Sequence, residues 1–180
     1  MKSLITQAVF RNNIIKLVIF IAIFVIWGCA STPTPPPNPE LTQLEVRQLQ
    51  TREYKSTPAI VMKAVIAALQ DEGFIISSSN PELGLVTAAM EQIAEDTATK
   101  SHQAFWYGKG MGTYQTTKRW EASATIGKHS EGVRVRINIV AKALTNTGGI
   151  AWSQPVYAAD IYQTIFSKVD KAIFLEKEKI

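Results

Sequence analysis

The stretch that decides the fold is RWEASATIGKHSEGVRVRINI, residues 119–139. Apolar side chains occupy every second position in both of its halves: Trp120, Ala122, Ala124 and Ile126, then Val133, Val135, Ile137 and Ile139. The residues between them are mostly polar or charged, which is typical of strands with one buried face and one wet face. Because KHSEG, residues 128–132, separates the two halves, the pattern predicts an antiparallel hairpin.

Helical periodicity lies on both sides of this hairpin. Thr57 and Pro58 form a helix-opening pair, and the apolar residues that follow predict a helix from Pro58 to about Asp71, with Gly73 as its stop. A second helix is expected from Tyr157 to Glu176. Its apolar face repeats at helical spacing: Ile161, Ile165, Val169, Ala172 and Ile173.

Shorter segments complete the pattern. Residues 74–78 and 85–90 are strand candidates joined by a turn over 79–82, and 146–149 forms a further turn. Residues 41–55 are ambiguous between a helix start and an edge strand; we favour a strand over 46–54. The sequence therefore predicts one α+β domain over 41–180. Its antiparallel sheet would carry two helices on one face, in a helix-grip-like plan.

The first 28 residues have the composition of an export signal. Eleven apolar residues run from Leu17 to Trp27, and three cations, Lys2, Arg11 and Lys16, precede them. As a helix this run spans about 16 Å, short of a bilayer core of about 30 Å, so we prefer a signal peptide to a permanent membrane anchor. Without the leader, 16 of the 19 basic residues remain against 15 acidic ones. The near balance argues against nucleic acid as a partner.

Cys29 is the only cysteine, which excludes an intramolecular disulfide and a multi-cysteine zinc site. Ile26, Trp27, Gly28 and Cys29 together resemble a lipobox, although such motifs usually have a small residue where Trp27 stands. The resemblance implies cleavage by signal peptidase II before Cys29 and covalent lipid on its thiol. In bacteria with two membranes, Ala30, which is not Asp, then implies sorting to the outer membrane. In a bacterium without an outer membrane, the lipid would hold the chain at the cell membrane. The alternative is a lone cysteine that happens to end an apolar run.

Five prolines fall within residues 30–40, directly after this cysteine. Proline fixes φ and donates no backbone hydrogen bond, so residues 29–40 should form an extended, semi-stiff tether about 30 Å long. A PxxP ligand for a partner domain is the alternative interpretation. The expected organisation is thus a signal peptide over 1–28, a lipidated linker over 29–40 and one domain over 41–180.

Two stretches of the domain carry a family resemblance: AALQDEGFIISSSNPELGLVTA, residues 67–88, and IYQTIFSKVDKAIFL, residues 161–175. They are similar to helix-grip domains of small Gram-negative outer-membrane lipoproteins, among them the BamC subunit of the β-barrel assembly machinery. The likeness covers about two thirds of the processed chain, and its motifs are loose. It implies a helix-grip fold and an envelope location.

Residues that could carry catalysis are sparse. His129 lies in the expected hairpin turn, and His102 follows Glu91, Glu95 and Asp96, which we interpret as a solvent-facing segment. A serine elbow, a paired-histidine zinc motif and a P-loop are absent from the sequence. We therefore expect a protein that is not an enzyme, with no metal and no cofactor besides the covalent lipid on Cys29.

The most distinctive segment is FWYGKGMGTY, residues 105–114. Its glycines are not placed between a strand and a helix, so it does not predict a phosphate-binding loop. We expect a flexible hairpin or flap whose aromatic residues Phe105, Trp106 and Tyr107 contact a partner together with Arg119. The alternative is that these aromatic residues fold back onto their own core.

These observations predict a nonenzymatic, membrane-anchored lipoprotein on the periplasmic face of the outer membrane. It would act as an interaction or assembly module with an envelope protein that the sequence does not identify. The alternative function is a small-ligand or lipid-binding domain that uses a cleft between the sheet and its helices.

Overall fold

The computed structural model describes residues 34–107 and 112–178. In chain order the elements are α2 (Gln43–Gln50), β1 (Thr51–Tyr54), α3 (Pro58–Asp71), β2 (Ile75–Asn80), β3 (Leu85–Ile93), α4 (Thr97–Tyr107), β4 (Gln115–His129), β5 (Gly132–Thr145), β6 (Ile150–Pro155) and α5 (Ala159–Glu178). The expected signal peptide, the motif from Ile26 to Cys29 and the first part of the linker lie outside the described residues. The predicted α+β class is confirmed.

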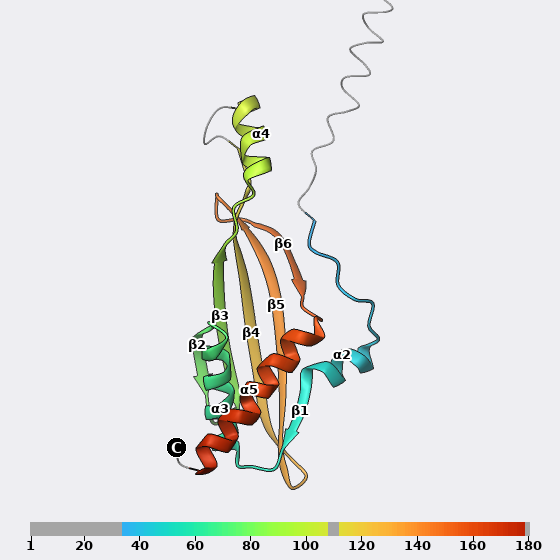
Figure 1. Ribbon diagram of the computed structural model, residues 1–180, viewed down its shortest axis with the longest axis vertical. Coiled ribbons are helices and arrows are strands. Elements are labelled where there is room, and N and C mark those ends of the chain that lie inside the picture. The colour runs from blue at the N-terminus through green and yellow to red at the C-terminus, as the bar shows by residue number, and fades with distance from the viewer. Residues whose placement is uncertain (1–33, 108–111, 179–180) are drawn as a thin grey trace, which may run out of the picture. The chain divides into compact units, whose positions relative to one another are not determined.

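The six strands form one antiparallel sheet in the order β1-β5-β4-β3-β2. β6 also pairs with β5, on the edge that β1 uses, so β1 and β6 share that edge end to end. The predicted hairpin is confirmed as β4 and β5, the two longest strands, with the pair His129–Gly132 closing it around Ser130 and Glu131. Figure 1 shows these two strands at the centre of the sheet.

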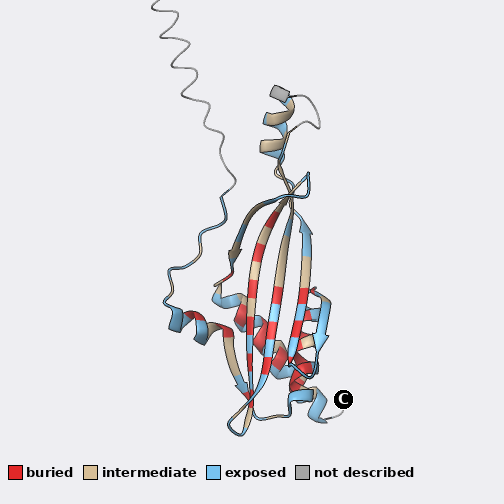
Figure 2. Cartoon of the chain, turned by 180° about the vertical axis from the view of Figure 1, so that it is seen from behind, coloured by how far each residue is buried: buried red, intermediate tan, exposed pale blue. Residues whose placement is uncertain are grey.

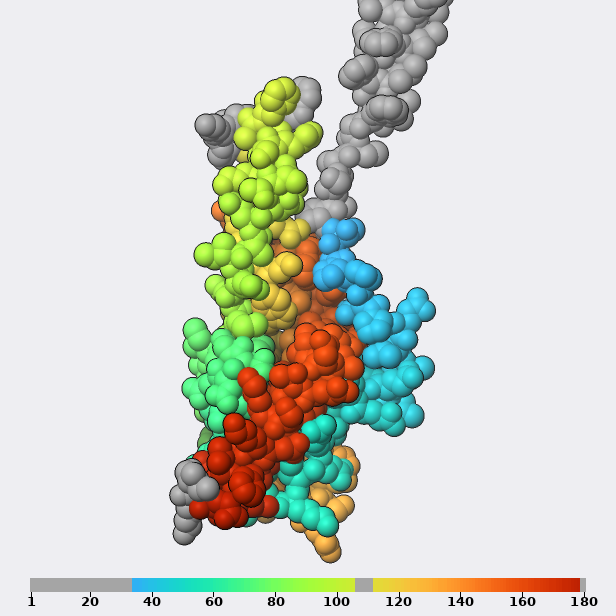
Figure 3. All heavy atoms as spheres, viewed as in Figure 1, coloured from blue at the N-terminus to red at the C-terminus, as the bar shows by residue number. Residues whose placement is uncertain are grey.

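Helices α3 and α5 pack against each other and against one face of the sheet, as predicted, and Figure 3 shows α5 lying diagonally across this face. The alternating residues of the central hairpin point toward them: Ala124 is fully buried, as are Val135 and Ile137. The helices contribute large side chains to the same cluster, including Leu69, Tyr162 and Phe166, each with at most 2% of its surface exposed. One apolar core therefore joins both helices to the sheet.

Local signals fix the ends of α3. The Thr57 side chain accepts a hydrogen bond from the Ile60 amide at 3.4 Å, and Pro58 is the first helical residue. Gly73 ends the helix with φ +85°, a conformation that costs glycine little. The prediction from Pro58 to Asp71 is confirmed at both ends. α5 begins and ends two residues later than predicted.

The predicted strand over 46–54 is wrong in its first half, because the segment begins with helix α2 and only its last four residues form β1. The cause is a capping box. The Thr42 side chain accepts from the Glu45 amide at 3.3 Å, and the Glu45 carboxylate accepts from the Thr42 amide at 2.8 Å. Val46, which suggested a strand, is buried on the inner side of this short helix.

Strand β6 was not anticipated. It pairs with the second half of β5, and its outer side contacts the proline-rich segment. Gln154 Nε2 donates to the Pro36 carbonyl at 2.8 Å, and Asn38 Nδ2 donates to the Pro155 carbonyl at 2.5 Å. The part of the linker that the structure describes is thus held beside β6.

Candidate interaction surface on the open face of the sheet

The second face of the sheet carries no helix among the described elements, and Figure 2 shows it with α3 and α5 behind. Burial alternates along the central strands in this view, as the sequence period of two requires. The side chains on the open face are mainly polar: Thr87 and Glu91 from β3, Arg119, Glu121, Ser123 and Thr125 from β4, and Arg134, Arg136, Asn138 and Lys142 from β5. We call these residues the open face.

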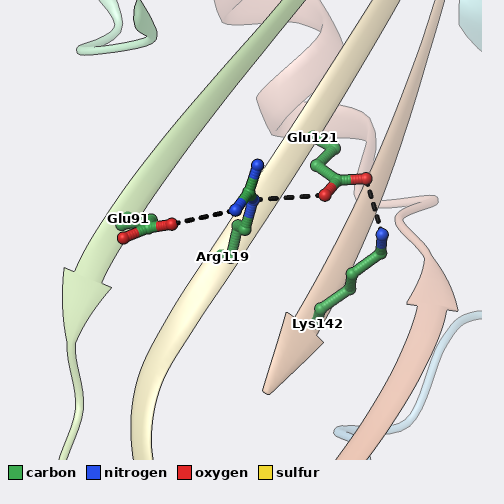
Figure 4. A network of polar contacts seen from close by, with 4 residues as sticks. All are labelled: Glu91, Arg119, Glu121 and Lys142. Atoms are coloured by element: carbon green, nitrogen blue, oxygen red, sulfur yellow. Dashed lines mark hydrogen bonds and ion pairs between the residues drawn. The ribbon is translucent and has the colours of Figure 1, made fainter. Parts of the chain in front are cut away.

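A chain of ion pairs crosses three strands of the open face (Figure 4). Arg119 Nη1 donates to Glu91 Oε1 at 3.1 Å, and Arg119 Nε lies 3.1 Å from Glu121 Oε1. Lys142 Nζ donates to the other Glu121 oxygen at 2.6 Å. The strand register explains the alignment, because Arg119 lies directly opposite Glu91 on one side and Lys142 on the other. The four charges balance.

This network is a tightly connected part of the open face, but it contributes little to stability. Its side chains are between 23% and 54% exposed, where water and salt screen ion pairs. The Nε of Arg119 is shielded from solvent and makes no hydrogen bond, because the Glu121 oxygen lies 3.1 Å away but not along the N–H direction. A hollow of about 320 Å³ lies beside Arg119 and Glu121, with hydroxyl groups from Ser77, Thr87 and Ser123 in its wall.

The aromatic residues predicted to form a flap lie instead in the last turn of α4, so the flap prediction is wrong for residues 105–107. Glycines 108 and 110 of the predicted flap lie outside the described residues. α4 stands beyond the end of the sheet, on an extension of the β3–β4 hairpin (Figure 1). Phe105 is 80% exposed on it, so it does not fold back onto the core.

Asp96 begins α4. Its carboxylate accepts from the Thr99 hydroxyl at 2.6 Å and from the Thr99 amide at 3.1 Å, and these two bonds lower the pKa of Asp96. Asp96 with Thr99 three residues later is a helix-start signal that the sequence analysis missed. On the same helix, Lys100 pairs with Glu95 at 2.5 Å and lies 5.5 Å from the ring centre of Tyr114.

Arg119 and the aromatic residues do not share one site. Arg119 pairs with Glu91 within the sheet, whereas α4 begins only after the β3–β4 hairpin has continued as far as Gln115. Four strand residues from Arg119 to Gln115 span about 13 Å. The structure thus divides the predicted recognition edge into an ion-pair network on the sheet and a separate arm, α4. The partners Glu91 and Lys142 depend on strand register, which the sequence period alone does not give.

In the described part of the chain, neither histidine belongs to a group of metal-ligating side chains. His129 contacts Arg134 and lies 3.3 Å from Glu53 at the β4–β5 turn. Within residues 34–107 and 112–178, no group of three His, Cys, Asp or Glu side chains converges to hold a metal ion. In the same part of the chain, the helices are too short or too polar to span a bilayer.

No protein-family model matches the chain, and no curated protein matches it. One solved structure that resembles it is the adenylate sensor from AMP-activated protein kinase in complex with 5-aminoimidazole-4-carboxamide 1-beta-D-ribofuranotide. The two are 12% identical, and the match covers 66% of this chain and 92% of that one, with a TM-score of 0.32. At that TM-score the likeness supports no statement about the fold or the function of this chain.

Proposed function

We propose that this chain is a nonenzymatic, lipid-anchored interaction module of the bacterial cell envelope, held at the periplasmic face of the outer membrane through Cys29. The leader, the lipobox-like motif and the proline-rich segment support the anchor. One observation supports the interaction role. The domain covers a single face of its sheet, leaves the other open and extends an arm with an exposed phenylalanine beyond it.

The interior of the domain favours this role over a ligand carrier. A carrier with this fold needs a cavity between the sheet and its helices. Here Tyr162 and Phe166 from α5 and Leu69 from α3 occupy that space, each at most 2% exposed. The Tyr162 hydroxyl donates to the Val156 carbonyl at 2.9 Å, so its polar atom is satisfied inside the core. The hollow beside Arg119 and Glu121 lies on the open face, outside this core.

The arm has the features of a contact element. Contiguous exposed apolar groups mark interaction sites, and aromatic residues dominate binding energy at interfaces. Phe105 is the most exposed aromatic residue for which the structure gives a value. Trp106 and Tyr107 follow it in the sequence, so the end of α4 concentrates three aromatic residues.

The interaction role is tested by capture from cross-linked envelopes, with the full chain as bait. Replacement of Phe105, Trp106 and Tyr107 by Ser should abolish enrichment of the partner that the wild-type chain retains. Phe174→Ser is the matched control, because Phe174 is 60% exposed on α5, on the opposite side of the sheet from the open face. Equal capture by the triple variant and the wild type would refute the role of the arm.

The anchor needs its own test. Cys29→Ser should prevent incorporation of labelled palmitate and release the chain from the outer-membrane fraction, since the thiol is the point of attachment. A Cys29→Ser chain that stays in that membrane as firmly as the wild type, with neither form labelled, would overturn the anchor. Because capture can be repeated on the released chain, failure of the anchor and failure of the arm are separate results.

A further inference from the structure

A groove of about 520 Å³ opens where α2, β1 and β5 meet, at the edge of the open face. Its lining includes four arginines, Arg47, Arg52, Arg134 and Arg136, and one carboxylate, Glu53. The formal charge of this lining is therefore +3, although the chain without its leader is almost neutral. The lining of this hollow therefore carries a local excess of positive charge.

The sequence builds this groove through local structure. The capping box fixes α2, which places Arg47 in its last turn, and β1 follows without a loop. β1 then pairs with β5 so that Thr51 lies opposite Arg136 and Glu53 opposite Arg134. Arg134 and Arg136 are two positions apart on one strand, so they point to the same face about 7 Å apart.

The four guanidinium groups are not equivalent. Arg52 turns toward the helices, where it pairs with Asp170 at 2.9 Å and lies 5.0 Å from the ring centre of Phe166. Arg134 holds Glu53 through two hydrogen bonds of 3.0 and 2.8 Å. Both of these arginines therefore have a carboxylate partner.

Arg47 and Arg136 have no carboxylate within ion-pair distance in the described part of the chain. Arg136 Nη2 instead donates to Gln50 Oε1 at 3.2 Å. Gln50 is only 4% exposed, so this polar residue is buried within the described part of the chain. A buried amide that holds one nitrogen of a surface arginine restricts its rotamers and leaves the other guanidinium N–H groups available to donate. Arg136 is thus positioned without being neutralised.

We propose that this groove binds a ligand that carries a phosphate monoester or pyrophosphate group, with its oxygens between Arg47 and Arg136. Guanidinium groups donate two parallel hydrogen bonds to phosphate oxygens, which a single ammonium group does not. A phosphate monoester carries about −1.5 to −2 charges at neutral pH, which matches the two unneutralised arginines. A soluble phosphate compound and a lipid headgroup share this chemistry.

The test uses the full chain in neutral detergent micelles and isothermal titration calorimetry. In one arm inorganic pyrophosphate is titrated, and in the other the micelles are doped with phosphatidic acid. Saturable binding in either arm is expected, and the arm that binds identifies the source of the phosphate. Arg47→Gln and Arg136→Gln should each weaken binding about tenfold or more, because each removes a charge-assisted pair. Arg136→Lys should recover only part of the loss.

Lys63→Gln is the matched control. It also removes one positive charge, but Lys63 lies on α3, and its side chain is 69% exposed and pairs with Glu176. Thermal unfolding of each variant establishes that the fold is retained. Absence of saturable binding in both arms would overturn the proposal. So would an equal loss in Lys63→Gln and Arg136→Gln, because that result would indicate general charge attraction. The outcome is independent of the anchor and of the arm.

Discussion

The two faces of the sheet come from the same strands but differ in burial and in charge. On the covered face, Ala124, Val135 and Ile137 are fully buried beneath α3 and α5. On the open face, their immediate neighbours in the chain are polar or charged: Ser123, Thr125, Arg134, Arg136 and Asn138. The ion pairs of this face are partly exposed. Burial of apolar area stabilises a fold, whereas screened ion pairs add little. Stability is therefore concentrated on the covered face, and substitutions on the open face should cost less stability.

The strongest test of this contrast is a matched pair of truncations on β5. Ile137→Ala should destabilise the domain by about 2–5 kcal/mol, because it leaves a cavity under the helices. Val140→Ala, on the open face of the same strand, should cost less than about 1 kcal/mol. Chemical denaturation of both variants measures the difference. Similar losses would show that the open face is packed as tightly as the covered one.

Two glycine turns sharpen the contrast between packed and open backbone. Gly84, between β2 and β3, has φ +63°, and a Cβ there would lie 2.0 Å from the Ile126 carbonyl oxygen. Gly84→Ala should therefore destabilise the domain by about 2 kcal/mol or more. Gly148 has φ +82° with nothing within 4 Å of the same position, so Gly148→Ala should cost only about 1 kcal/mol. The thermal midpoints of the two variants rank them, and the reverse order would contradict the close approach at Gly84.

The arm belongs to neither face and should respond to pH by itself. The Thr99 hydroxyl and amide lower the pKa of Asp96 below its ordinary value of 3.8. The ionised carboxylate therefore stabilises α4 fully at pH values above that ordinary pKa. That contribution is lost as the pH falls through the lowered pKa of the folded state. We expect the Thr99 amide to lose protection from hydrogen exchange in this acid range before the amides of β4 and β5 do.

Two variants of Asp96 separate the cap from the titration. Asp96→Asn keeps a capping side chain without an ionisable group, so α4 should persist and its acid response should disappear. Asp96→Ala removes the cap and should weaken α4 by about 1 kcal/mol at every pH. An acid response that survives in Asp96→Asn would assign it to another group.

The smallest effect is expected in the ion-pair network. Glu121→Gln breaks the contacts with Arg119 and Lys142, but Glu121 is 37% exposed. The unfolding free energy should fall by less than about 1 kcal/mol, and less at high salt than at low salt. Denaturation at two ionic strengths measures this. A loss as large as that of Ile137→Ala would mean that the open face, too, is a structural core.

Sequence periodicity predicted the elements whose pattern is regular. The β4–β5 hairpin and both ends of α3 follow it, because alternation and capping act within a few residues. The outer ends of the hairpin lie beyond the predicted segments, since β4 begins at Gln115 and β5 ends at Thr145. The predictions failed where two local signals compete. Val46 and Tyr54 suggested one strand, but the capping box of Thr42 and Glu45 starts a helix first. The flap prediction for the end of α4 rested on the glycine-rich segment that follows it and missed the Asp96 cap.

The candidate site depended on more than local pattern. Alternation placed Arg119 and Glu121 on the wet face, but only the strand register sets Glu91 and Lys142 beside them. The groove joins Arg47 of α2 to Arg136 of β5, which lie far apart in the sequence. No short-range rule connects such residues, since their distance depends on how β1 pairs.

The sequence by itself determined the class of fold, the face of each central strand that is buried and the position of the single cysteine after an apolar run. These features follow from periodicity and composition, which are properties of neighbouring residues. Only the tertiary structure decided which charges meet on the open face, that α4 stands apart from the core and that the arginines share one groove. Such contacts depend on strand register and on packing between distant segments, because long-range pairing brings together residues that the chain keeps apart.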